Sequence, residues 1–232
     1  MIVAANFKTN MTRQSTREYL DTLDDFLATR HHDDDTIMVF PPATALDACH
    51  CAVKIGAQNA YATRNGAYTG EIGLEQLDEF DIRTILIGHS ERRHILGESQ
   101  EEIVHKFNFF KEQGFSIIYC IGEPLEIRES GSHALMEYLE AQLEDIDLGY
   151  ANLMIAYEPV WAIGTGMTPS TDDILLIHNA LKKLVQRPLL YGGSVKPENA
   201  REIMALANVD GVLVGGASLH IEDFKLIIQA TN

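Results

Sequence analysis

The feature that most constrains the fold of this chain is a series of short apolar runs separated by longer segments with helical periodicity. Runs such as Ile-Met-Val-Phe and Val-Leu-Val are apolar at consecutive positions, which is typical of parallel strands covered on both faces. Between them, apolar residues recur every three or four positions, as in Tyr19, Leu20 and Leu23, which predicts crossover helices. Eight strands are predicted, at Ile2–Phe7, Thr36–Phe40, Lys54–Asn59, Thr84–Gly88, Ser116–Ile121, Asn152–Glu158, Leu189–Tyr191 and Gly211–Val214.

Eight such units in 232 residues favour an α/β fold in which eight parallel strands close into a (β/α)8 barrel. An open doubly wound sheet is the alternative, but no Gly-x-Gly-x-x-Gly follows the first strand. No linker or low-complexity stretch divides the chain, so we expect one barrel domain over residues 1–232. In such a barrel, function resides in the loops that follow the carboxyl ends of the strands.

The charge of the chain limits its partners. The formal net charge is -16, which repels nucleic acid and anionic membranes, so neither is an expected partner. A phosphate ligand would then need local attraction from a lysine and from backbone N–H groups. No apolar run reaches membrane-spanning length, and the first residues do not read as an export signal.

The cysteines and histidines do not predict a metal site. Three cysteines, Cys49, Cys51 and Cys120, cannot all pair, and the Cys-x-Cys spacing lacks the second ligand pair of a zinc site. The eight histidines other than His89 lie in predicted loops or helices without metal-ligand spacing. Reduced thiols predict a cytoplasmic protein.

Two strand ends carry polar side chains that suit an active site. Asn6 and Lys8 end the first strand two residues apart, so both project to one side. A lysine there is either solvated or a fixed cation for phosphate and enolate charge. His89 ends the fourth strand, and the Ser90-Glu91 pair that follows can begin a helix whose dipole lowers the pKa of His89. The alternative is a structural histidine.

The sixth strand ends in a carboxylate, Glu158, followed at once by an apolar loop between a proline and glycines. Such a loop is costly in water unless it closes over something, and closure would desolvate Glu158 and raise its proton affinity. In the alternative interpretation the loop is packed permanently and Glu158 pairs with an arginine. The predicted lid consists of Val160, Trp161, Ala162, Ile163, Gly164, Thr165 and Gly166.

Glycine pairs follow the last two strands. Gly192-Gly193 precedes Ser194, and Gly215-Gly216 leads into a helix near Ala217. Either pair alone is compatible with an ordinary turn. Together they match the usual phosphate position of (β/α)8 enzymes, where backbone N–H groups approach an anion.

The motifs resemble those of the triosephosphate isomerase family over nearly the whole chain and in order. The matching segments are A-A-N-F-K-T-N, G-A-Q-N-A-Y, N-G-A-Y-T-G-E, G-H-S-E-R-R, C-I-G-E, A-Y-E-P-V-W-A-I-G-T-G, Y-G-G-S-V and G-V-L-V-G-G-A-S-L. The resemblance implies reversible interconversion of D-glyceraldehyde 3-phosphate and dihydroxyacetone phosphate through a cis-enediolate, in glycolysis and gluconeogenesis, without a metal or organic cofactor.

By that resemblance, Glu158 is the base that moves a proton between adjacent carbons, and neutral His89 moves protons between the two oxygens. Lys8 supplies positive charge, and Asn6 orients the substrate and Lys8. The supporting residues are Ser90, Glu91 and Cys120, and the phosphate-binding residues are Gly164, Ser194, Gly215 and Gly216.

The resemblance also implies a homodimer, in which the loop from Asn65 to Glu71 places Thr69 near the partner's catalytic lysine and histidine. The chain departs from the family at Thr9, where methionine is common, and at Met167-Thr168-Pro169, which replaces a Lys-x-Ala-like lid hinge.

Two other functions compete with this one. An aldolase on the same barrel would need a Schiff-base lysine or a metal cluster, and Lys8 is the only strong candidate lysine. An inactive barrel kept as a binding protein would have lost Glu158, His89 or Lys8, and all three are present.

Overall fold

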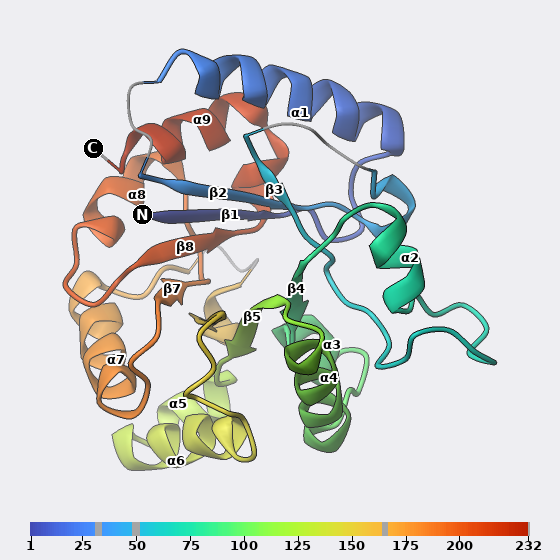
Figure 1. Cartoon of the computed structure of the whole chain (residues 1–232). Coiled ribbons are helices and arrows are strands. Elements are labelled where there is room, and N and C mark those ends of the chain that lie inside the picture. The colour runs from blue at the N-terminus through green and yellow to red at the C-terminus, as the bar shows by residue number, and fades with distance from the viewer. Residues whose placement is uncertain (31–33, 48–51, 164–166, 232) are drawn as a thin grey trace.

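In the computed structural model, residues 1–30, 34–47, 52–163 and 167–231 are described, and they form a nearly closed barrel of eight parallel strands with helices around it (Figure 1). The predicted (β/α)8 barrel is confirmed. The strands are β1 Ile2–Asn6, β2 Thr36–Phe40, β3 Lys54–Ile55, β4 Thr84–Ile87, β5 Ser116–Ile121, β6 Leu153–Tyr157, β7 Leu189–Tyr191 and β8 Gly211–Val214.

The strand order is β3-β2-β1-β8-β7-β6-β5-β4, and each neighbouring pair is parallel. Ala57, just beyond β3, closes the circle onto β4: its N–H donates to Thr84 O, and its carbonyl accepts from Leu86 N–H, each over 2.9 Å. Because parallel strands end at the same edge of a sheet, the carboxyl ends of all eight strands form one rim.

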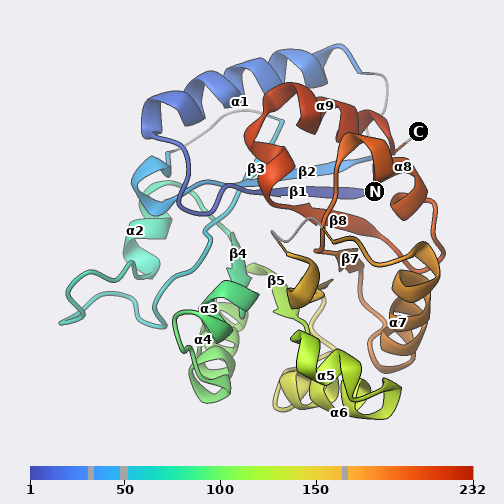
Figure 2. The ribbon, with the colours of Figure 1, turned by 180° about the vertical axis from the view of Figure 1, so that it is seen from behind.

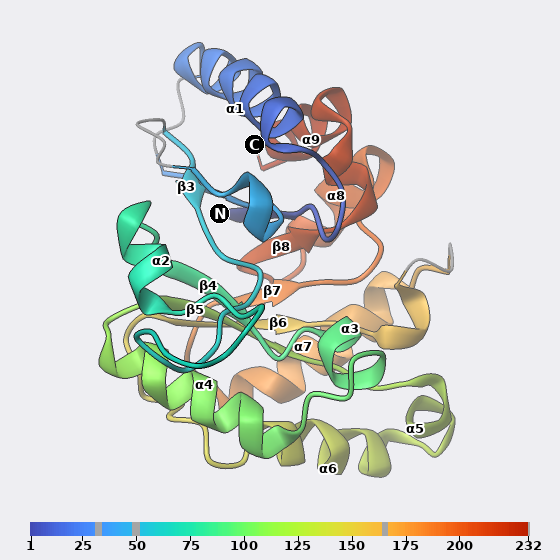
Figure 3. The same ribbon diagram turned by 90° about the vertical axis from the view of Figure 1, so that its right-hand side faces the viewer.

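Helices cover the outside of the barrel. Figure 2 shows α8 and α9 beside the last strands, and Figure 3 shows α1 and α9 on the opposite side of the barrel from α4 and α6. The α-helices are α1 Arg13–Ala28, α2 Leu74–Glu79, α3 Ser90–His94, α4 Gln100–Glu112, α5 Leu125–Glu129, α6 Ser132–Leu143, α7 Thr171–Leu184, α8 Pro197–Met204 and α9 Ile221–Gln229. Short 3₁₀ turns occur at η1 Ala43–Ala45, η2 Val160–Ala162 and η3 Gly216–Leu219.

The apolar residues form two layers, which explains why the strands are apolar at consecutive positions. On β1, Val3 and Ala5 face the helices and join the larger core, whereas Ala4 points into the barrel. The interior layer contains Met38, Phe40, Leu86, Ile118, Cys120, Met154, Ala156, Leu190 and Leu213. Among the residues that the structure describes, no helix is long and apolar enough to cross a membrane.

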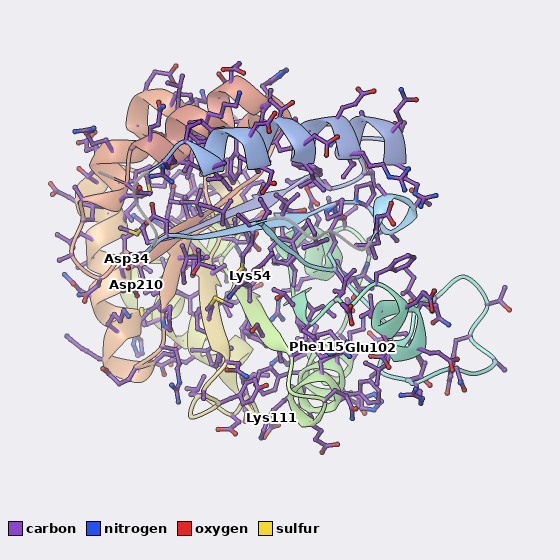
Figure 4. All side chains as sticks on the ribbon, turned by 45° about the horizontal axis from the view of Figure 1, so that its top comes forward. Asp34, Lys54, Glu102, Lys111, Phe115 and Asp210 are labelled. Carbon is purple, nitrogen blue, oxygen red and sulfur yellow. The ribbon has the colours of Figure 1, made fainter. Side chains whose placement is uncertain are left out.

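Several strands are shorter than predicted at the rim. The first ends at Asn6 and the sixth at Tyr157, although Phe7 and Glu158 each still donate one backbone hydrogen bond to the neighbouring strand. The opposite rim is marked in Figure 4 by Asp34, Lys54 and Phe115, each at or just before the start of its strand.

Candidate active site

A cavity of about 570 Å³ opens at the carboxyl ends of β1, β4, β6, β7 and β8. It brings together most of the residues that the sequence predicts for catalysis and phosphate binding, namely Asn6, Lys8, His89, Glu158, Ile163, Ser194, Gly215 and Gly216. Lys196 and His220 also line its edge, although the sequence analysis did not assign them to a site.

Lys8 is held at the mouth of the barrel. Its φ of 52° lies in the left-handed region that side chains other than glycine seldom adopt. The Oδ1 atom of Asn6 accepts the Lys8 N–H over 3.0 Å, and the Lys8 Nζ donates to Glu91 Oε1 over 2.6 Å. Asn6 therefore holds the backbone of Lys8, and Glu91 holds its ammonium group.

Glu158 is 1% exposed and has two hydrogen-bond partners from the end of β4. Its Oε1 atom lies 2.9 Å from His89 Nε2, and its Oε2 atom accepts the Ser90 N–H over 2.9 Å. This arrangement differs from the pairing with an arginine that was the alternative interpretation.

Glycines on both sides let neighbouring strands approach Glu158 closely. A Cβ atom added to Gly122, after β5, would lie 1.7 Å from the Glu158 carbonyl oxygen. A Cβ atom added to Gly192, after β7, would lie 2.9 Å from Glu158 Cγ. Only glycine fits at either position without moving the base.

His89 is the N-cap residue of α3, and its Nδ1 atom accepts the Glu91 N–H over 3.2 Å. A nitrogen that accepts a hydrogen bond carries no proton, so the neutral ring has its proton on Nε2, facing Glu158. Burial lowers the pKa of His89, but the charge and hydrogen bond of Glu158 outweigh burial, and the pKa is raised. The lowered pKa predicted from the helix dipole is wrong for this arrangement, because the carboxylate touches the ring.

The pKa of Glu158 also differs from expectation. Burial raises it, but the charge and hydrogen bond of His89, the Ser90 N–H and the charge of Lys8 together lower it. The increase in proton affinity predicted from desolvation is therefore absent in this arrangement. The proton affinity of Glu158 rises only when its carboxylate leaves these partners.

The phosphate end of the cavity consists of backbone. Gly192, Gly193 and Ser194 follow β7, and Gly215 and Gly216 lead from β8 into η3. A Cβ atom at Gly215 would lie 3.7 Å from Lys8 Nζ, so the ammonium group lies beside the second glycine pair. The glycine backbone and the Lys8 ammonium group thus lie together where the sequence predicts phosphate binding.

The described part of the predicted lid is anchored by Glu123, a residue that the sequence analysis did not single out. The Trp161 indole N–H and the Tyr157 hydroxyl both donate to Glu123 Oε1 over 3.0 Å, and the Val160 N–H donates to its carbonyl over 3.1 Å. Burial raises the pKa of Glu123, although these hydrogen bonds oppose it. The position of Glu123 directly after an apolar strand, in C-I-G-E, was the available signal.

Other predicted residues lie outside the cavity or outside the described residues. Cys120 points into the barrel as a buried free thiol, and burial raises its pKa. Thr69 is exposed in the loop between β3 and α2, which extends away from the barrel in Figures 1 and 2. The residues at 164–166, which include the predicted phosphate ligand Gly164 and the lid residues Thr165 and Gly166, are not among those described. Across the described ranges, no three His, Cys, Asp or Glu residues group as metal ligands.

Comparison with known proteins agrees with this geometry. The sequence model of the family described as "Triosephosphate isomerase" matches residues 1–231. A triosephosphate isomerase of Sulfurovum sp. (strain NBC37-1) is 60% identical over 99% of this chain and 100% of its own length. Those of Sulfurimonas denitrificans and Nitratiruptor sp. are 57% and 53% identical, over 97% and 99% of this chain and 93% and 97% of their own lengths. The chain belongs to the triosephosphate isomerase family.

Proposed function

We propose that Glu158, His89 and Lys8 carry out the isomerase reaction in this chain, the reversible interconversion of D-glyceraldehyde 3-phosphate and dihydroxyacetone phosphate. The observation that carries this proposal is the contact between Glu158 and His89 in a cavity that the glycines after β7 and β8 also line. A substrate whose phosphate lies on the glycines places its carbonyl and adjacent carbon between Lys8 and these two residues.

The substrate replaces Glu158 on the imidazole. The Nε2–H of His89 then donates to a substrate oxygen, and Glu158, freed from the contacts that lower its pKa, gains proton affinity in a site without water. Glu158 removes a proton from the carbon next to the carbonyl, the electron pair moves onto the oxygen, and Lys8 and His89 stabilise the enediolate. After His89 moves a proton between the two oxygens, Glu158 returns its proton to the other carbon.

The lid excludes water during these steps. Ile163 lines the cavity beside Glu158, and Trp161 is hydrogen-bonded to Glu123. Closure of an apolar segment over the site protects an enediolate from losing its phosphate. No step needs a metal or organic cofactor.

We also propose that the chain acts as a homodimer in the cytoplasm. A second cavity of about 640 Å³ adjoins the first and is lined by Lys8 and His89 together with Ile95 and Leu96, which are 77% and 66% exposed. Two large apolar side chains beside a catalytic lysine are suited to contact with another subunit. The protruding loop with Thr69 has the form needed to enter this cavity of a partner.

The test is a coupled assay of glyceraldehyde 3-phosphate conversion in both the original protein and Glu158→Gln. Fast turnover in the first and a loss of several orders of magnitude in the second are expected, because an amide cannot accept the proton. If the folded protein is inactive, the isomerase proposal fails. If Glu158→Gln stays fully active, the role of Glu158 as base is wrong.

A further inference from the structure

A buried glutamine on α6 holds the end of β5 by both atoms of its side-chain amide. Gln142 is 7% exposed. Its Oε1 accepts the Gly122 N–H over 3.0 Å, and its Nε2 donates to the Gly122 carbonyl over 2.9 Å. One side chain therefore satisfies both backbone groups of the residue at which β5 leaves its ladder, as a neighbouring strand would have done.

The glycine held in this way supports the backbone of Glu158. The residue before it, Ile121, accepts the Glu158 N–H over 2.7 Å. A Cβ atom at Gly122 would lie 1.7 Å from the Glu158 carbonyl oxygen, so the two backbones are in direct contact. A shift of Gly122 would consequently move the residue that carries the catalytic carboxylate.

The main chain of Gln142 is linked to the other side of the active site. Its carbonyl accepts the Tyr119 hydroxyl over 2.6 Å, and Arg93 Nη2 donates to that hydroxyl over 3.1 Å. Arg93 Nε in turn donates to the carbonyl of Gly88, directly before His89, over 2.8 Å. A continuous set of hydrogen bonds thus runs from the backbone next to His89, through α6, to the backbone next to Glu158.

We infer that Gln142 is a positioning residue for the isomerase reaction, which sets where Glu158 stands relative to the substrate through the two hydrogen bonds to Gly122. This inference rests on the proposed role of Glu158 as the base. Gln142 does not line the cavity, and its side-chain amide reaches Glu158 through the backbone of Gly122. Misplacement of a catalytic group by about 1 Å can cost roughly a hundredfold in rate, so two hydrogen bonds at this point have a large effect.

The substitution Gln142→Glu tests this with almost no change of shape. An ionised carboxylate still accepts the Gly122 N–H, but it cannot donate to the Gly122 carbonyl and repels it. A protonated carboxyl has one acceptor and one donor, as the amide has. Burial beside a carbonyl favours the protonated form, so lowering the pH restores the original pair of hydrogen bonds.

We expect kcat of Gln142→Glu to be lower than that of the original protein by about tenfold to a hundredfold near pH 8. The ratio of the two kcat values should recover as the pH falls to about 5.5. The KM and the inhibition constant of inorganic phosphate should stay within about threefold, because the glycines proposed to hold phosphate follow β7 and β8. Gln142→Met, which removes both hydrogen bonds without adding charge, should lose kcat at every pH. The matched control, Gln113→Glu, changes an exposed glutamine and should match the original protein throughout.

The inference is overturned if kcat of Gln142→Glu equals that of the original protein near pH 8, or if its loss does not recover on acidification. It is also overturned if phosphate affinity falls as much as kcat, since that indicates general damage to the site. Glu158→Gln is assayed in parallel. If that variant is inactive while Gln142→Glu is unaffected, only the role of Gln142 is wrong, and if Glu158→Gln is fully active, the proposed base is wrong.

Discussion

The pKa values of two buried glutamates, Glu158 and Glu123, shift in opposite directions because their partners differ. Both lose solvation, which raises the pKa of each. Glu158 faces His89, Ser90 and Lys8, whose charges and N–H groups reverse the shift. At Glu123 the hydrogen bonds of Trp161 and Tyr157 and the charge of Arg128 do not outweigh burial, so its pKa stays raised. In this arrangement Glu158 therefore holds a proton less tightly than an ordinary glutamate, and Glu123 holds one more tightly.

These pKa shifts could not be predicted from the sequence. Glu158, His89 and Lys8 could be assigned to the site because each follows a strand end. The direction of each shift depends on which atoms touch, and the 2.9 Å contact between Glu158 and His89 joins residues 69 positions apart. The sequence analysis also did not identify Gln142. A glutamine in a predicted helix does not indicate that its side chain binds a glycine beyond the end of a strand.

The first prediction concerns Glu123 and pH. Its folded-state pKa is raised, so its contribution to stability is fully present below the pKa of the unfolded chain and is lost as the pH rises through the folded pKa. Glu123→Gln removes this titration and keeps an acceptor for Trp161. The unfolding free energy of the variant minus that of the original protein, measured by denaturant unfolding, should increase from about pH 4 to pH 8, by up to about 1.4 kcal/mol per pH unit between the two pKa values. A difference that is constant or decreases with pH would contradict the raised pKa.

The second prediction concerns Lys8. Lys8→Met removes the cation beside Gly215 and the ion pair with Glu91. We expect kcat/KM to fall by at least about a hundredfold, because the developing enediolate loses its fixed charge, and inhibition by inorganic phosphate to weaken. The control is Lys111→Met, which removes the surface ion pair with Asp147, labelled at Lys111 in Figure 4, and should leave steady-state kinetics unchanged. Unaltered phosphate inhibition in Lys8→Met would argue against its assigned role.

At the scale of elements, the strands hold in place the residues that follow their carboxyl ends, and the candidate site residues are among these. The sequence predicts all eight strands, because consecutive apolar residues are required wherever a strand is covered on both faces. The ends are predicted less well. The third strand has only Lys54 and Ile55 in the ladder, and two hydrogen bonds of Ala57 close the barrel. Both features depend on the neighbouring strand, so the local sequence could not predict them.

The third prediction follows from the close approach of β7 to Glu158. Gly192→Ala would place a Cβ atom 2.9 Å from Glu158 Cγ and 3.3 Å from the Tyr157 carbonyl oxygen, so the base must move. We expect kcat to fall by about tenfold or more with a smaller loss of stability. Gly149→Ala, at an exposed position near a flexible aspartate side chain, is the control. Steady-state kinetics with a thermal melt separates the two effects, and an unchanged kcat in Gly192→Ala would mean that the position of Glu158 tolerates the shift.

The fourth prediction concerns the end of the lid. Pro169 is buried and lies just before Ser170, the N-cap residue of α7. Pro169→Ala frees one φ angle, so we expect faster lid motion in relaxation measurements and a protein less stable by about 1 kcal/mol. If product release limits turnover, kcat depends less on solvent viscosity in the variant. Identical relaxation rates in the two proteins would exclude a role of this proline in lid motion.

At the scale of the whole molecule, a strongly acidic chain must bind an anionic substrate. The net charge of -16 gives no long-range attraction for a triose phosphate, so we expect binding to depend on Lys8 and on the glycine backbone beside it. The same rim carries the second cavity and the exposed apolar pair Ile95 and Leu96. In the proposed dimer, catalysis and subunit contact share one end of the barrel, so assembly is expected to affect activity.

The last prediction tests that connection. Leu96→Glu places a carboxylate on an apolar surface that lines the cavity next to Lys8 and His89, so burial against a partner becomes costly. We expect sedimentation to show a dimer for the original protein and a monomer for the variant, with kcat/KM lower by about tenfold or more because Lys8 and His89 lose their covering. Leu226→Glu, at a 51% exposed leucine on α9, is the matched control and should remain dimeric and active. A fully active monomer of the original protein would refute the homodimer, and a dimeric Leu96→Glu would place the interface elsewhere.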